Sequence, residues 1–553
     1  MVWFNEQIHS EIHSEKKFIK IADFCPITPK IAKMGKSRRF ATVGFSAFGA
    51  INFADSAVRY RKKVLISQCY LYNVCVMITF ITCLVVLVVA YFLYGGLMSC
   101  IAGIDPKADV PSRSMYDGVD YIPMPRWRIF LIQLLNIAGT GPIFGAILGA
   151  CYGPVAFLWI TLGGIFVGAM HDYLSGVISL RNGGKSLPEI IGKYLGSGMH
   201  RLTLLLIPLL MILVGVVFIV TPSQILTDKT DIPYLAWVVI IIVYYFVATI
   251  LPVDKIIGKI YPIFGAALIG MALAFFGVLL FGNYTIPELT SVGNMHFNAE
   301  NLPIVPTLFI SIACGAVSGF HATQSPLMAR CVTSETQTRP VFFGAMISES
   351  IIALIWAAMA MAFFGGVEGL NGFMEANGSN AGVVVSLISD TTLGTVGSIL
   401  AILGVVVAPI TSGDTAFRSA RLIVADMLGY DQRPIYKRLV ICIPLFAIGI
   451  AIAFVDFDVI WRYFAWSNQA LSVFTLWMIT AWLMRKGGAF YALALVPAIF
   501  MTYICSSFIF VSTQFVGMGA TTAAYVYGAA TTAVVSGLLM LKIRRDVKRG
   551  SEI

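Results

Sequence analysis

Long apolar runs alternate with short polar connections along the whole chain after its first seventy or so residues. The runs lie near 74–94, 128–150, 154–179, 202–220, 232–251, 261–282, 303–326, 340–364, 383–409, 438–454, 460–483, 488–511 and 520–541. As helices, most of these runs are long enough to cross roughly 30 Å of hydrocarbon. The pattern therefore predicts an all-α polytopic membrane protein with about 13 transmembrane helices. The run at 383–409 is the weakest because Asp390 lies inside it, and its core is expected at 395–409.

Composition narrows the classes of protein that this chain can be. Hydrophobic residues make up 58% of the 553 residues and charged residues only 12%, against about 25% charged in soluble proteins. This excludes a cytosolic enzyme, a secreted domain and a nucleic-acid-binding protein, and it makes the lipid bilayer the expected surrounding. The ten cysteines are dispersed without a C-x-x-C pair, so we expect no metal site and no disulfide framework.

The distribution of Lys and Arg predicts the orientation. Five basic residues follow position 541, which places the C-terminus in the cytoplasm, whereas the loops 283–302, 365–382 and 512–519 contain no Lys or Arg and are expected outside. The loops near 180–201, 327–339, 410–437 and 484–487 are basic and are expected inside. Residues 1–73 are also basic, which opposes this topology, so we expect them to be an extension outside the core of membrane spans.

Two of the predicted spans carry strong helix-breaking signals. The first contains Gly139, Thr140, Gly141 and Pro142, after which a half-helix is expected to begin near Ile143 with free N–H groups. The second contains Gly315, Ser318, Gly319, His321, Thr323, Gln324 and Pro326 within one apolar run. The predicted topology gives the two broken spans opposite directions, five spans apart. Interrupted helices in corresponding positions are typical of a secondary transporter's binding site, although each break alone can be a structural kink.

Ionisable side chains inside predicted spans are candidates for ion coupling, because they are costly in hydrocarbon. Glu349 lies near the middle of its span and is the leading proton carrier, with a neutral structural glutamate as the alternative. His171 and Asp172 lie toward the inner end of theirs. The stretch 409–415, with Thr411, Ser412 and Asp414, is expected to be an unwound helix end that suits a hard cation such as sodium. The alternative is a plain turn at the cytoplasmic surface.

The stretches 117–125, 130–139 and 141–150, the sequence His171-Asp172-Tyr173 and the regions 344–349 and 411–426 are similar to the carbon starvation protein family, CstA, in its shorter form. The resemblance covers roughly 73–545. It implies bacterial inner-membrane proteins linked to peptide uptake in carbon starvation, some relatives carrying pyruvate with protons. It also implies an inverted five-plus-five repeat of the amino acid–polyamine–organocation (LeuT-like) type.

Together these features predict a secondary transporter that imports peptides or pyruvate by cation symport, with proton more favoured than sodium. We expect no bound cofactor beyond the coupling ion, and no enzyme. A channel or a nutrient sensor is the alternative. The expected division is an extra helix and loop at 74–127, a core at 128–511 with a C-terminal CstA-type region from about 340, and a last helix with a basic tail at 512–553. The sequence leaves the oligomeric state open.

Overall fold

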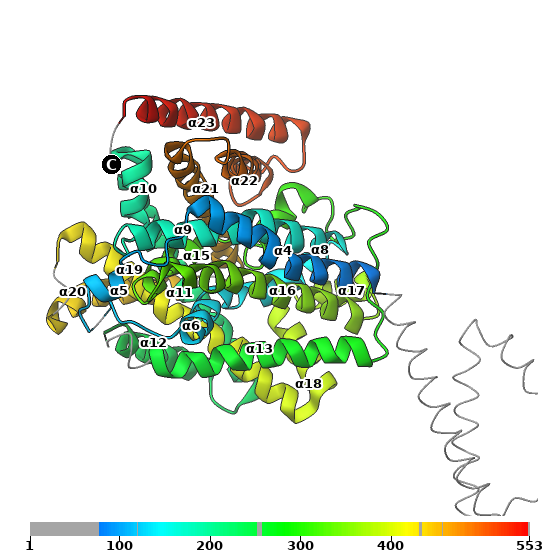
Figure 1. Cartoon of the computed structure of the whole chain (residues 1–553). Coiled ribbons are helices and arrows are strands. Elements are labelled where there is room, and N and C mark those ends of the chain that lie inside the picture. Colours follow the sequence, from blue (N-terminus) through cyan, green and yellow to red (C-terminus); the bar gives the residue numbers. More distant parts are fainter. Residues whose placement is uncertain (1–76, 119, 251–256, 431–433, 456, 551–553) are drawn as a thin grey trace, which may run out of the picture. The chain divides into compact units, whose positions relative to one another are not determined.

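The computed structural model describes residues 77–118, 120–250, 257–430, 434–455 and 457–550, which belong to the compact unit Tyr70–Ile553 (Figure 1). Every regular element in this described part is helical. The predicted all-α class is therefore confirmed. The expectation for residues 1–73 lies outside the described residues, and the subdivision at 127 and 511 stays a prediction.

The first half of the chain contains helices that follow the predicted apolar runs closely. They are α4 (Ile78–Ala102), α5 (Pro111–Ser114), α6 (Arg126–Ala138), α7 (Gly141–Ala150), α8 (Val155–Leu158), η1 (Trp159–Ala169), α9 (Met170–Arg181), α10 (Leu187–Leu195), α11 (Ser197–Lys229), α12 (Tyr234–Ile250) and α13 (Ile257–Phe281). α8, η1 and α9 continue into one another, so they act as one span. α4 ends at Gly103, whose φ of 62° is a left-handed cap that glycine adopts without strain.

The second half has more interruptions. Its elements are η2 (Ile304–Leu308), α14 (Phe309–Ser311), α15 (Gly319–Ala329), η3 (Glu335–Gln337), η4 (Arg339–Phe343), α16 (Gly344–Phe363), α17 (Val367–Ala376), α18 (Ala381–Ala401), η5 (Ile402–Val406), α19 (Val407–Leu428), α20 (Ile435–Ala453), α21 (Phe457–Lys486), α22 (Ala492–Val511) and α23 (Thr522–Lys548). Figure 1 shows that α4, α16 and α13 run roughly parallel across the view.

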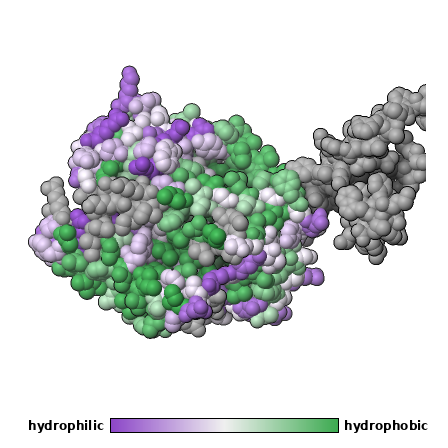
Figure 2. All heavy atoms as spheres, turned by 90° about the horizontal axis from the view of Figure 1, so that it is seen from below, coloured by the Kyte–Doolittle hydropathy of each residue, from purple (hydrophilic) through white to green (hydrophobic). Residues whose placement is uncertain are grey.

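In the described part, eight helices are long and apolar enough to cross a membrane, or nine if α6 and α7 count as one bent span. The other predicted spans exist as helices but are too short, too interrupted or too polar to qualify. Large apolar side chains on the outer helices face outward, as Leu93 on α4 does with 71% of its surface exposed. Figure 2 shows a broad apolar area between hydrophilic ends. Such an area is expected where lipid replaces water.

The span η4–α16 lies at the centre of the molecule. Nearly every residue of α16 is buried, and it contacts α7, α6, η1, α13 and α4. α4 instead buries only a narrow stripe of its surface. Glu349 is therefore buried on the candidate span of the described part that is most enclosed by other helices.

One predicted span is interrupted. The run at 383–409 breaks at Gly394 (φ 55°, ψ −140°), directly before the core expected at 395–409, and that core is helical but continues through η5 and α19 to Leu428, well beyond its predicted end. Arg418 and Arg421, assigned to a cytoplasmic loop from their charge, are each only 1% exposed inside α19. A guanidinium N–H of Arg418 donates to the carbonyl of Ala248 at the end of α12. Buried polar partners therefore allow a helix where charge alone predicts a loop.

The loops predicted on each side of the membrane do gather in two separate groups. At one end, Arg181 Nε lies 2.8 Å from Glu335 Oε1, and the Lys486 ammonium donates to the carbonyl of Ala102 over 2.7 Å. Three basic connections thus meet at this end. The three loops without Lys or Arg meet elsewhere, around one cavity described below.

Candidate functional site

The first predicted break is present and short. α6 ends at Ala138 and α7 begins at Gly141, with a bend of 46° between them. Gly139 adopts φ 41° and ψ −139°, a backbone conformation that other residues rarely take. The Ile143 N–H, which was expected to be free, donates to the carbonyl of Thr140 over 3.2 Å, and the Phe144 N–H donates to the same carbonyl over 2.8 Å. The expectation of a free N–H at Ile143 is therefore not met, whereas substrate binding at this break stays a prediction.

The second break is longer but ends earlier than predicted. Residues 312–318 are non-helical, and α15 starts at Gly319, so Thr323, Gln324 and Pro326 lie within a regular helix. The start of α15 is capped from α21: the Phe320 N–H donates to Asn468 Oδ1 over 2.7 Å, and Asn468 Nδ2 donates to Ser318 Oγ over 3.0 Å. This cap replaces the missing helical partners.

The two breaks press against each other through glycines spaced four residues apart on α7. A Cβ added at Gly141 would lie 2.2 Å from Cys314 Cβ, and one at Gly149 would lie 2.3 Å from the side chain of Ile312. A Cβ added at Gly145 would lie 2.9 Å from the carbonyl oxygen of Ser311. Small residues at this spacing let membrane helices approach closely. The backbone of the first break thus packs directly on the second.

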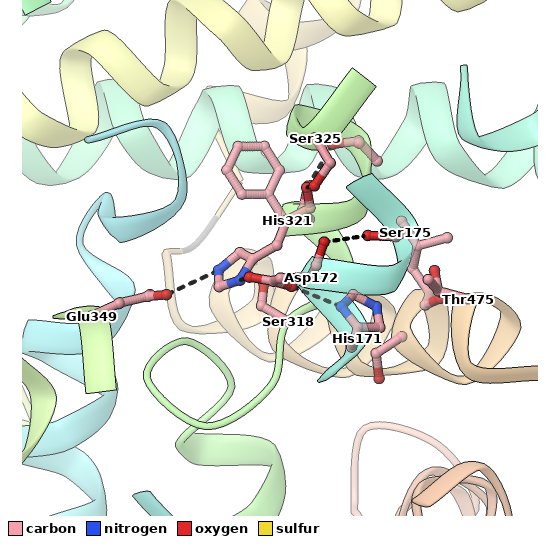
Figure 3. A network of polar contacts seen from close by, with 12 residues as sticks. His171, Asp172, Ser175, Ser318, His321, Ser325, Glu349 and Thr475 are labelled. Carbon is pink, nitrogen blue, oxygen red and sulfur yellow. Dashed lines mark hydrogen bonds and ion pairs between the residues drawn. The ribbon is translucent and has the colours of Figure 1, made fainter. Parts of the chain in front are cut away.

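A chain of four ionisable side chains crosses the second break (Figure 3). Asp172 on α9 accepts from two imidazoles, one at each carboxylate oxygen: His171 Nδ1 at 2.8 Å and His321 Nδ1 at 2.8 Å. His321 Nε2 in turn lies 3.4 Å from Glu349 Oε2 on α16. All four side chains are fully buried. The sequence singled out each of these residues, and the structure brings them together.

Hydrogen-bond chemistry limits the protonation states of this network. With Asp172 ionised, His321 Nδ1 must carry a hydrogen toward it. In the neutral imidazole, Nε2 can accept a hydrogen bond from a protonated Glu349, whereas in the charged imidazole it can donate one to the Glu349 carboxylate. The distance of 3.4 Å between His321 Nε2 and Glu349 Oε2 is longer than a usual hydrogen bond, and a small movement of the two side chains toward each other would form one. One proton can therefore sit on either side of this gap.

The ends of the network are open to further partners. His171 Nε2 at one end and both carboxylate oxygens of Glu349 at the other have no hydrogen-bond partner among the described residues. One potential metal-ligand atom from each of Cys314, His321 and Glu349 lies within 4.8 Å of the other two, so the three side chains could together coordinate a metal ion. The Cys314 sulfur, however, lies 3.6 Å from Ser318 Oγ and is placed to donate to it as a neutral thiol. The prediction of no metal therefore stays a prediction.

Further polar side chains around the first break were not recognised from the sequence. Gln133 and Asn136 on α6 are fully buried, and neither amide has a partner among the described residues. The hydroxyl of Thr140 is also buried without a hydrogen-bond partner among the described residues. At the second break, by contrast, Gln324 Nε2 donates to Thr323 Oγ1 over 3.1 Å. Buried amides without partners are costly unless something binds them. A Gln and an Asn on one helix face just before a glycine break are the signal that could have found them.

The cluster Thr411, Ser412 and Asp414 is not the unwound helix end predicted, because all three lie inside the continuous helix α19 and are buried. Ser412 Oγ donates to the carbonyl of Leu135 over 2.9 Å, in the last turn of α6 before its break. The Tyr261 hydroxyl donates to Asp414, whose Oδ1 has no partner in the described part. The cluster therefore borders the first break rather than the cytoplasmic surface.

A cavity of about 670 Å³ opens between the loops that lack Lys and Arg. We call it the Arg462 cavity. Its lining includes His296 from the 283–302 loop, Asn377 from the 365–382 loop and Gln514 from the 512–519 loop. Phe144 and Leu148 of α7 also line it, so it reaches the half-helix that follows the first break. The three loops therefore lie on the same side, as the charge pattern predicts.

Comparison with known proteins agrees with these features. The family described as carbon starvation protein CstA matches residues 74–233 and 220–390. The chain belongs to the CstA family. The match includes both broken helices and all four residues of the buried network. The family resemblance stated from the sequence is thereby confirmed.

Relatives of this CstA-family protein include named transporters. An uncharacterised membrane protein of Haemophilus influenzae is 41% identical over 352 aligned positions, and the alignment covers 54% of this chain and 95% of the relative. A protein of Campylobacter jejuni named peptide transporter CstA is 25% identical over 582 aligned positions, covering 82% of this chain and 81% of its own. An Escherichia coli protein named pyruvate/proton symporter BtsT is 25% identical over 390 aligned positions, and the alignment covers 56% of this chain and 54% of the relative.

The likeness to solved structures is weaker. MhsT in complex with L-phenylalanine superposes with a TM-score of 0.49 at 13% identity, over 77% of this chain and 99% of that one. A likeness of that size supports no argument here. The multi-pass helical fold is established by the helices themselves, and the inverted five-plus-five repeat stays a prediction.

Proposed function

We propose that this protein is a secondary active transporter that imports small carboxylate-bearing nutrients, peptides or pyruvate, by symport with protons. The names of the relatives support transport across a membrane and argue against an enzyme. The observation that carries the proposal is the buried chain from His171 through Asp172 and His321 to Glu349. Such a concentration of ionisable groups at membrane depth is retained where protons or ions pass.

The geometry supports a coupling step at the gap between His321 Nε2 and Glu349. These two side chains come from different elements, α15 and α16, and α15 starts at the second break. A proton on Glu349 keeps that side chain neutral, whereas its loss leaves a charge that, among the described residues in contact with it, a charged His321 can offset. The proton therefore favours one separation of α15 and α16 over another, and so biases the two states of the transporter.

The energy available to such a step is substantial. A membrane potential of 100 mV supplies about 2.3 kcal/mol per charge moved. Since about 1.4 kcal/mol is a factor of ten, one proton per substrate supports roughly fifty-fold accumulation of a neutral solute. Moving one charge across a network of this kind is therefore enough for useful uptake from a dilute medium.

The proposal includes an orientation and a cellular setting. We place the charged end around Arg181 and Glu335 in the cytoplasm with the C-terminus, and the Arg462 cavity outside, because basic loops favour the inner side. We also propose the bacterial inner membrane and a role in carbon starvation, by analogy with the CstA family. No bound cofactor is proposed beyond the coupling ion.

Sodium is the second candidate for the coupling ion, and one contact favours it. Ser412 Oγ meets the Leu135 carbonyl beside the first break, where helix carbonyls lose their normal partners. Asp414 lies two residues further along α19, with one carboxylate oxygen unpartnered in the described part. Hydroxyl, carbonyl and carboxylate oxygens are the ligands that hard cations prefer. Sodium coupling would use this cluster rather than Glu349.

The test is uptake of labelled dipeptide and labelled pyruvate into proteoliposomes, with proton and sodium gradients imposed separately. We expect accumulation with an inward proton gradient and none with a sodium gradient alone. Accumulation with sodium only would replace the proton by sodium. A channel would equilibrate substrate without trans-stimulation by unlabelled substrate inside, and a sensor would show no flux, so either result would overturn the proposal.

A further inference from the structure

The Arg462 cavity is electrostatically one-sided. Among the described residues that line it, Arg462 is the only side chain with a formal charge at neutral pH, and none is Asp or Glu. Burial lowers the pKa of His296 to about 4, so this imidazole is neutral under the same conditions. A positive charge in a concave site whose described lining contains no acid attracts and holds an anion.

The cavity also lies where an imported substrate would first meet the broken helices. Its wall includes Phe144 on α7, whose ring centroid is 6.4 Å from that of Trp461, the residue before Arg462. The start of α7, below this point, is closed by the Thr140 carbonyl and by Cys314. A carboxylate therefore finds no free N–H groups at Ile143, and Arg462 is the alternative partner at the cavity.

Size and lining favour a peptide over a smaller acid. The volume of about 670 Å³ falls within the range of roughly 300–1,000 Å³ for small-molecule sites, and an acid as small as pyruvate would leave most of it empty. Side-chain amides line it from four segments, represented by Gln224, Asn301, Asn377 and Gln514. Amides both donate and accept hydrogen bonds, as peptide groups require.

We infer that the Arg462 cavity binds a short peptide, with Arg462 holding the free C-terminal carboxylate and the side-chain amides contacting the peptide groups. This rests on the proposed import function only for its place in the transport cycle. A guanidinium presents paired donors that match the two oxygens of a carboxylate. Arg462 would thus set a preference for substrates with a free carboxylate.

The test is equilibrium binding of alanylalanine and of its C-terminal amide to the purified full chain, without any ion gradient. We expect the free acid to bind roughly tenfold tighter than the amide, and tighter than pyruvate. Arg462→Gln should remove the preference for the acid, and Arg462→Lys should keep part of it. Gln224→Glu, which adds a negative charge to the cavity, should weaken binding of the acid more than that of the amide.

Arg113→Gln is the matched control, because it makes the same change at an exposed residue outside the cavity and should leave the preference unchanged. Equal binding of acid and amide to the wild type, an undiminished preference in Arg462→Gln, or tighter binding of pyruvate than of alanylalanine would each overturn the inference. Because binding is measured without an ion gradient, the result tests the peptide site independently of proton coupling. Tight, Arg462-dependent binding without gradient-driven uptake would refute only the proposed function.

Discussion

The buried network and the Arg462 cavity handle charge in opposite ways. In the network, Asp172, His321 and Glu349 are fully buried, come from three helical elements, and lie within 3.4 Å of their neighbours. In the cavity, one exposed guanidinium faces amides and aromatic rings, with no acid in its described lining. The first arrangement suits a proton, whose transfer needs short contacts and little water. The second suits a larger anion, which needs space and access.

This difference separates energy coupling from recognition. Changes in the network should alter how far the substrate is accumulated, whereas changes in the cavity should alter which substrate binds. The two breaks join the regions: α7 leads from the cavity wall to Gly141, which packs on Cys314, and α15 carries His321. The following predictions break or sharpen this separation, from the largest expected effect to the smallest.

Asp172→Ala should have the largest effect. It removes the acceptor shared by His171 and His321 and leaves both imidazoles buried without it. Breaking a buried charged pair by removing one partner costs about 3–5 kcal/mol. We expect a lower temperature of thermal inactivation and no gradient-driven uptake, while Asp172→Asn, which keeps an acceptor oxygen, should lose stability less. Asp109→Asn at an exposed site is the control. Normal stability and uptake in Asp172→Ala would contradict the role of the network.

Gly141→Ala should disrupt the contact between the two breaks. Its Cβ would lie 2.2 Å from Cys314 Cβ and 2.3 Å from Cys314 Sγ, so one of the breaks must shift. Overpacking of this kind typically costs about 1–3 kcal/mol. We expect reduced uptake and reduced thermal stability, and recovery of both when Cys314→Gly is added to remove the clashing atoms. A double variant no better than the single one would show that this contact is not the cause.

Ser412→Ala distinguishes the two coupling sites. It leaves the Leu135 carbonyl without its hydroxyl partner, for a loss of about 1–3 kcal/mol of stability. If coupling runs through the buried network, proton-driven accumulation per folded molecule should be unchanged. The measurement is uptake normalised to the amount of folded protein. Loss of the ion dependence itself would move coupling to the cluster on α19.

His296→Gln should have the smallest effect, confined to low pH. The pKa of His296 in the folded protein, about 4, lies below its usual value near 6.5. As the pH falls, His296 is therefore protonated in the unfolded chain before it is protonated in the folded protein. The stability contributed by a neutral His296 is present above pH 6.5 and is lost as the pH falls toward 4. Thermal scans at pH 7 and pH 4.5 should show a smaller drop for His296→Gln than for the wild type. An identical drop would contradict the burial argument.

Much of the fold could be predicted from the sequence because its causes are local. Gly139 and Pro142 predict the first break, and the apolar runs predict the ends of many helices to within a few residues. α19 could not be predicted in this way, because Arg418 and Asp414 read as surface residues unless their buried partners on other helices are known. Local pattern carries no information about such partners.

The candidate site was predicted in its parts but not in its assembly. Asp172, His321 and Glu349 each stood out as ionisable groups in apolar runs. Their contact could not be predicted, since Asp172 and His321 are 149 residues apart. Two residues of α21 carry no signal in the sequence that distinguishes them from other polar residues. Only the folded structure shows that Asn468 caps α15 and that Arg462 lines the cavity.

The most direct test of the central claim compares Glu349→Gln with the wild type in proteoliposomes under an inward proton gradient. Glutamine mimics the protonated carboxyl and cannot release a proton. We expect the variant to insert, to bind dipeptide and to exchange it in counterflow, but to lose accumulation of the dipeptide, which is roughly fifty-fold for one proton at a total driving force of 100 mV. Glu375→Gln, the same change at an exposed residue of α17, should accumulate normally. Proton-driven accumulation by Glu349→Gln at the wild-type level would contradict the account.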